Sequence, residues 1–112
     1  IDNSVVDKST FRMLHKGIRY FQKDTSYVSR NKARLTELLL TEPKHTFEDL
    51  EKIKCPVLVM AGQKDIVKEE HTRAIAKSIK RSTLNIVAGA THFLPQENGR
   101  LFNKIVLEYL GY

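Results

Sequence analysis

A chain of 112 residues is long enough for one small domain. Hydrophobic residues make up 41% and charged residues 29%, as in ordinary soluble proteins, and no apolar run approaches the roughly 20 residues of a membrane-spanning helix. The net charge of +6 permits an anionic partner, but no RNA-binding signature and no zinc-finger spacing accompanies it. We therefore expect no nucleic-acid partner and no membrane partner, and interpret the early basic residues as a solvated helix face.

The first half of the chain has helical periodicity. Apolar residues recur at helical spacing over 8–22 and over 26–40, which predicts two amphipathic helices. Thr46 and Asp49 have the spacing of a capping box, so one short helical turn is expected over 46–50. The candidate N-caps are Asp7 or Ser9 for the first helix and Ser26 or Ser29 for the second.

The second half alternates strands with helices. Two short apolar runs, 57–61 and 84–88, predict strands, and helical spacing over 67–80 and over 98–110 predicts helices. A strand, helix and strand in this order form a parallel pair with a right-handed connection. The predicted fold is therefore α/β, with two parallel strands and about four to five helices. Two strands rarely make a durable sheet by themselves, so the pattern is typical of part of a larger one.

One titratable side chain follows each predicted strand. Asp65 comes three residues after Gly62, and His92 comes three residues after Gly89. Taken alone, Asp65 is a turn or helix-capping aspartate and His92 is a surface histidine. The carboxyl ends of parallel strands meet at one sheet edge, where ligands and catalytic groups gather. Together the two side chains therefore predict a carboxylate that orients a histidine general base.

Other kinds of site find no support in the sequence. No His, Cys, Asp and Glu cluster has metal-ligand spacing, and neither a P-loop nor G-x-G-x-x-G is present, so we expect no metal and no cofactor. Cys55 is the single cysteine, which excludes an internal disulfide and suits a reducing cytoplasm. We expect a cytoplasmic protein in which Cys55, next to Pro56, is buried.

These motifs together resemble the C-terminal portion of the α/β-hydrolase-fold family. The matching stretches are Ile53-Lys54-Cys55-Pro56-Val57-Leu58-Val59-Met60-Ala61-Gly62-Gln63-Lys64-Asp65, then Gly89-Ala90-Thr91-His92-Phe93-Leu94-Pro95-Gln96-Glu97-Asn98, and a last helix that ends near Tyr109. The resemblance implies that Asp65 is the acid and His92 the histidine of a catalytic triad. It also implies two parts: residues 1–49 as the end of a helical cap with the helix leading into the sheet, and residues 50–112 as the C-terminal part of the core.

The nucleophile of such a triad is missing from this chain. In the family it precedes the acid, in a G-x-S-x-G turn, and no such pattern occurs here. We expect a chain that begins inside a longer esterase-like hydrolase of a small-molecule substrate, inactive by itself, with Ser, Asp or Cys as the nucleophile. The alternative is a non-catalytic interaction module that self-associates or pairs with a partner through its open sheet edge.

Overall fold

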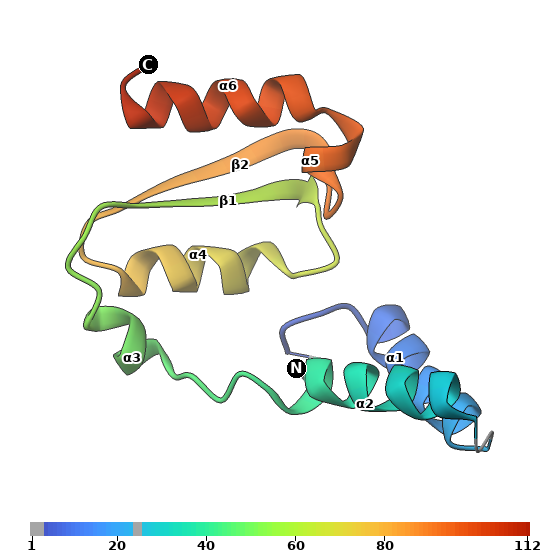
Figure 1. Cartoon of the computed structure of the whole chain (residues 1–112). Coiled ribbons are helices and arrows are strands. Elements are labelled where there is room, and N and C mark those ends of the chain that lie inside the picture. Colours follow the sequence, from blue (N-terminus) through green and yellow to red (C-terminus); the bar gives the residue numbers. More distant parts are fainter. Residues whose placement is uncertain (1–3, 24–25) are drawn as a thin grey trace. The chain divides into compact units, whose positions relative to one another are not determined.

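The computed structural model describes residues 4–23 and 26–112, apart from the side chain of Phe21. The chain divides into two compact units, Ile1–His45 and Thr46–Tyr112. Each unit is built from elements that lie next to one another in the sequence (Figure 1).

The first unit is a pair of packed helices, α1 (Lys8–Gln22) and α2 (Tyr27–Thr41). Of the candidate caps, Asp7 begins α1, and its carboxylate accepts hydrogen bonds from the backbone N–H groups of Ser9 and Thr10 at 2.9 and 3.0 Å. Ser26 begins α2, and its hydroxyl oxygen accepts from the Ser29 N–H at 3.2 Å. Both predicted helices are confirmed to within one residue at each end.

The second unit contains the sheet. Its elements in chain order are α3 (Phe47–Glu51), β1 (Val57–Lys64), α4 (Glu69–Ser78), β2 (Ser82–Thr91), α5 (Leu94–Glu97) and α6 (Gly99–Leu110). Local signals set several of these boundaries. Thr46 and Asp49 form the predicted capping box, and the Asn98 side chain accepts from the Leu101 N–H at 3.1 Å to begin α6. Gly111 ends α6 in the left-handed conformation, with φ of 86°.

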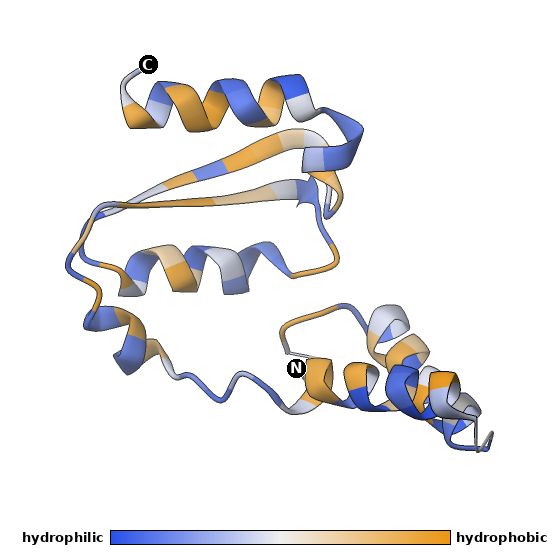
Figure 2. Ribbon diagram, viewed as in Figure 1, coloured by the Kyte–Doolittle hydropathy of each residue, from blue (hydrophilic) through white to orange (hydrophobic). Residues whose placement is uncertain are grey.

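β1 and β2 run parallel and form a two-stranded sheet among the described residues. Within this unit α4 lies on one face of the sheet and α6 on the other (Figure 1). Both strands are apolar along much of their length, as expected for strands covered on both faces (Figure 2). The buried apolar side chains of the unit come from α4 and its end, β2 and α5: Ala76, Ile79, Val87 and Leu94.

The predicted α/β class and parallel strand pair are confirmed, and three details differ. Both strands continue beyond the apolar runs that predict them, because backbone pairing extends to the polar ends of β1 and β2. The four-residue helix α5 brings the described helices to six, whereas four to five were expected. Cys55 is exposed, so its predicted burial is wrong: it precedes β1 and lies outside the packed layers.

No helix within residues 4–23 and 26–112 combines the length and the apolar character that crossing a bilayer demands.

Candidate active site

A break in the strand pairing shapes the edge of the sheet where the candidate residues lie. Gly62 pairs with Val87, but the next pair is Lys64 with Thr91, so β2 contains two extra residues at this point. Gly89 lies in this bulge with φ of 71°, a conformation that suits glycine. The Gln63 side-chain oxygen accepts a hydrogen bond from the Gly89 N–H at 3.0 Å, which fastens the bulge to β1.

Gly62 allows the bulge to press against β1. A Cβ atom at this position would lie 2.3 Å from the carbonyl oxygen of Ala90 and 2.5 Å from that of Thr91. Only glycine leaves room for such an approach. The backbone just before His92 is therefore held against the strand that leads to Asp65.

Asp65 lies at the turn after β1. Its N–H donates to the carbonyl oxygen of Gly62 at 3.2 Å, and its Oδ1 accepts from the Val67 N–H at 2.9 Å. The carboxylate is thus the turn aspartate that the sequence allows, and its side chain is only 10% exposed. The same oxygen has a second partner, which the turn alone does not require.

That second partner is His92. Its Nδ1 lies 2.9 Å from Asp65 Oδ1, so the predicted proximity of the two side chains is confirmed. A carboxylate accepts hydrogen bonds, so it favours the tautomer with the proton on Nδ1. Nε2 is then left with a lone pair that can take a proton. The histidine side chain is 46% exposed, and its ring meets that of Phe93 edge to face with centroids 5.7 Å apart.

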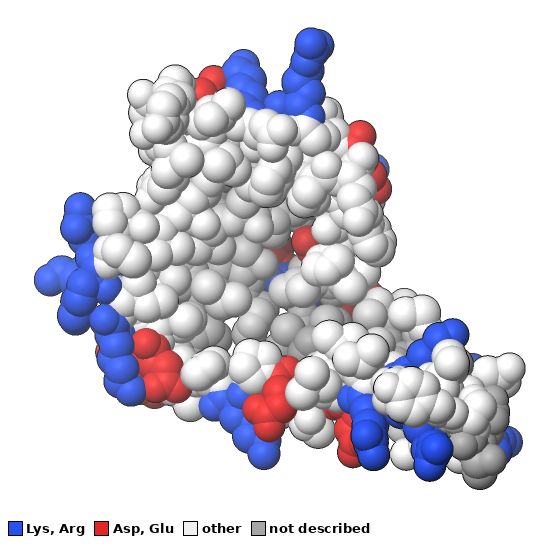
Figure 3. Space-filling model, in the orientation of Figure 1, with Lys and Arg blue, Asp and Glu red and all other residues white. Residues whose placement is uncertain are grey.

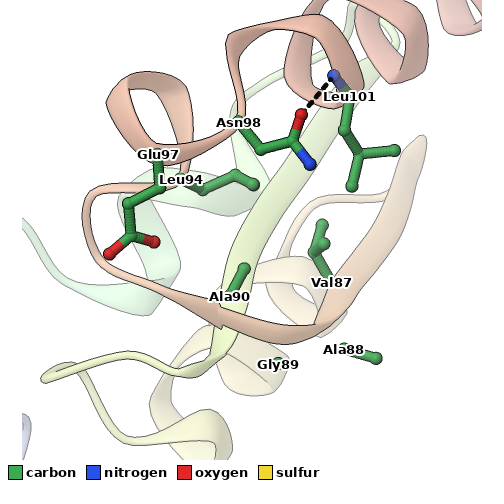
Figure 4. A pocket seen from close by; sticks show the side chains of 8 residues that line it. All are labelled: Val87, Ala88, Gly89, Ala90, Leu94, Glu97, Asn98 and Leu101. Atoms are coloured by element: carbon green, nitrogen blue, oxygen red, sulfur yellow. Dashed lines mark hydrogen bonds between the residues drawn. The ribbon is translucent and has the colours of Figure 1, made fainter.

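A small pocket adjoins the pair. Its volume is about 160 Å³, and its lining includes Asp65, His92, Met60, Pro95 and Phe102. A second, separate pocket of about 310 Å³ lies between β2 and the segment that contains α5 and α6. Figure 4 shows Val87, Ala90, Leu94 and Leu101 around this second pocket, which is largely apolar.

Two of the other histidines, His15 and His71, each contact an aromatic side chain of their own unit. His15 contacts Phe11 within α1, with ring centroids 4.4 Å apart, and His71 contacts Phe47 at 5.8 Å. In the described part of the chain, no group of three or more His, Cys, Asp or Glu side chains is arranged to hold a metal ion.

Sequence reasoning assigned no role to Gln63, Glu97 or Thr91, although all three lie within the motifs that carry Asp65 and His92. Gln63 binds the bulge, and Glu97 binds Thr91 next to His92. Both contacts depend on the bulge and on α5, which leave little trace in hydrophobic periodicity. The sequence offered one signal for the role of Gln63: it is a polar residue at the end of an apolar run, two positions before the turn aspartate Asp65.

Known structures resemble this chain in fold. A thermophilic esterase from Thermogutta terrifontis is 25% identical, with a TM-score of 0.64, and the match covers 95% of this chain and 39% of the esterase. A serine hydrolase involved in carbazole degradation is 22% identical, with a TM-score of 0.64 over 77% of this chain and 35% of its own. A carboxylesterase from Bacillus subtilis is 16% identical, with a TM-score of 0.61 over 96% of this chain and 47% of its own.

No protein-family model and no curated protein matches the chain. The structural matches nevertheless agree with one another, since all three are hydrolases that share this arrangement of helices and parallel strands. The chain therefore has the fold of part of an α/β hydrolase, as its motifs indicate, and it spans between 35% and 47% of the length of these structures.

Proposed function

We propose that this chain is the C-terminal part of an esterase-like α/β hydrolase and supplies the acid, Asp65, and the histidine, His92, of its catalytic triad. The observation that carries the proposal is the 2.9 Å contact between His92 Nδ1 and Asp65 Oδ1 at the ends of adjacent parallel strands. The esterase and hydrolase structures of the same fold support it.

The chemistry follows from the two ring nitrogens of His92. Nε2 takes the proton of a nucleophile that attacks a small ester, amide or related substrate, and later gives a proton to the leaving group. Asp65 holds the tautomer that leaves Nε2 free and stabilises the imidazolium that forms. The nucleophile and the oxyanion-binding N–H groups come from residues outside this chain, which contains no G-x-S-x-G turn.

The first prediction concerns activity. We expect the purified 112-residue chain to leave p-nitrophenyl acetate uncleaved, because positioning of a nucleophile supplies much of an enzyme's acceleration. The complete hydrolase that contains it should cleave the ester. There, His92→Ala should remove most turnover, and Asp65→Asn should lower kcat by about 10⁴-fold, because an amide donor enforces the wrong histidine tautomer.

Steady-state kinetics of the complete protein check this prediction, with Glu108→Gln as the matched control. Glu108 is an exposed carboxylate near the end of α6 whose ion-pair partner within the described residues is Lys104, at 3.7 Å, so its neutralisation should leave kcat unchanged. A complete protein that hydrolyses esters equally well after both site substitutions would disprove the proposal.

One observation favours a second candidate, a non-catalytic module that associates through its sheet. Among the described residues β1 is paired only with β2, so its other edge offers backbone N–H and C=O groups to a further strand. The two candidates differ in what completes the sheet: the preceding part of a longer hydrolase, or a second protein chain. Sequencing the coding region upstream of Ile1 distinguishes them, since a G-x-S-x-G or G-x-D-x-G turn there indicates the enzyme.

A further inference from the structure

The carboxylate of Glu97 binds the residue that precedes His92. Thr91 Oγ1 donates to Glu97 Oε1 at 2.7 Å, and the Thr91 N–H donates to Oε2 at 3.4 Å. The same Thr91 hydroxyl accepts a hydrogen bond from the Phe93 N–H at 3.1 Å. The residues on both sides of His92 are therefore joined in one hydrogen-bonded network that ends on Glu97.

The helix α5 brings Glu97 back to this loop. Leu94 anchors α5 with a side chain only 4% exposed, and the N–H groups of Gln96 and Glu97 donate to the carbonyl of Phe93 at 2.8 and 2.9 Å. In Figure 4 the Leu94 side chain points toward the interior, and the Glu97 carboxylate points the other way. The direction of the carboxylate is thus set by a short, anchored helix.

The network bears on the orientation of the histidine ring. Its two ends, at Thr91 and Phe93, restrict the backbone dihedrals of His92, and these determine where Cβ and the ring lie. The Thr91 hydroxyl both donates and accepts, so the bond to a charged carboxylate strengthens the bond from Phe93. Asp65 alone cannot do this, because it contacts the ring and not the loop.

We infer that Glu97 is a positioning residue, which holds the His92 loop in the arrangement that places Nδ1 on Asp65. The inference rests on the proposed function for the importance of His92, but the contacts that carry it are those of Glu97 with Thr91. It adds a second carboxyl-bearing residue to the site beside Asp65, one that acts through the backbone and without touching the reacting atoms.

The test measures the tautomer of His92 in the 112-residue chain. Long-range proton–nitrogen NMR at mildly alkaline pH gives the ratio of the Nδ1–H to the Nε2–H form. We expect the Nδ1–H form to dominate in the unmodified chain and the ratio to fall about tenfold in Glu97→Ala, since a hydrogen bond to a charged group is lost. Glu97→Gln should give an intermediate ratio, because one amide oxygen can still accept from Thr91.

Two controls separate positioning from general loss of structure. Glu108→Ala removes another exposed carboxylate of the same unit and should leave the ratio unchanged. The backbone amide resonances of β1 and α4 report whether each variant remains folded, and Glu97→Gln, which keeps the length of the side chain, serves as the deciding variant if Glu97→Ala does not fold.

The outcomes distinguish this inference from the proposed function. If the Nδ1–H form of His92 does not dominate in the unmodified chain, the Asp65–His92 hydrogen bond is disproved, and the inference about Glu97 with it. A dominant form that persists in folded Glu97→Ala and Glu97→Gln overturns the positioning role alone and leaves the pair intact. A fall in the ratio of the Nδ1–H to the Nε2–H form in both variants, larger in Glu97→Ala than in Glu97→Gln, supports the role of Glu97.

Discussion

At the scale of single residues, Gly62 and Gly99 offer a sharp contrast in the space around them. A Cβ at Gly62 would meet two backbone carbonyl oxygens within 2.5 Å, whereas one at Gly99 would meet nothing within 4 Å. Backbone oxygens cannot move aside as a flexible side chain can. The close approach of β2 to Gly62 is therefore a requirement of the site, because the carbonyls belong to the residues just before His92.

We predict that Gly62→Ala destabilises the fold by at least about 2 kcal/mol, through forced separation of the bulge from β1. Gly99→Ala is the matched control and should stabilise slightly, by about 0.5 kcal/mol, since it restricts the unfolded chain at no steric cost. Urea unfolding of both variants measures the difference. An equal midpoint for the two alanine variants would show that the bulge yields easily.

Asp65 and His92 could be predicted because each follows the apolar run of a strand, and parallel strands bring their ends together. The contacts that hold the backbone around His92 could not be predicted from the sequence. Gly62 and Gln63 depend on a bulge that adds two residues to β2, and hydrophobic periodicity does not register such an insertion. Glu97 depends on α5, a helix too short to have a periodic pattern.

At the scale of elements, side-chain caps begin α1, α2, α3 and α6, and the N-cap of α1 has a consequence for pH. The hydrogen bond from the Ser9 hydroxyl, followed by that from the Thr10 N–H, holds the pKa of the Asp7 carboxyl well below its ordinary value of 3.8. A carboxyl with a lowered pKa in the folded chain contributes stability above its ordinary pKa and loses that contribution as the pH falls through the lowered one.

We therefore predict that the N-terminus of α1 keeps its cap on acidification to pH 3.8 and below, while an ordinary aspartate becomes half protonated there. The amide resonances of Ser9 and Thr10, followed against pH, report the cap directly. In Asp7→Asn the side-chain oxygen still accepts these bonds, so the same resonances should not titrate. A midpoint at 3.8 in the unmodified chain would contradict the prediction.

At the scale of the whole molecule, the charge is spread over the elements. On the face drawn in Figure 3, Lys and Arg lie on both units with Asp and Glu among them, and a broad part of the sheet-containing unit is uncharged. This distribution offers no continuous basic surface on that face.

The last prediction follows from the edge of β1 that no other strand among the described residues pairs with. A sheet of two parallel strands is marginal, and the open backbone groups of β1 can pair with those of another chain. We expect light scattering at micromolar concentration to report a dimer or a larger assembly. Hydrogen exchange should locate the contact, with the amides of β1 that do not bond to β2 becoming protected as the concentration rises.

The exposed leucines of α2 provide the control for this assignment. Leu35, Leu38 and Leu39 are 63%, 52% and 51% exposed, so a contact through α2 is the main competing route to association. Leu38→Lys should leave the assembly intact if the sheet edge forms it and should dissociate it if α2 does. A monomer that persists at micromolar concentration with a high thermal stability would contradict both routes, because it would mean that the two strands and their helices need no further strand.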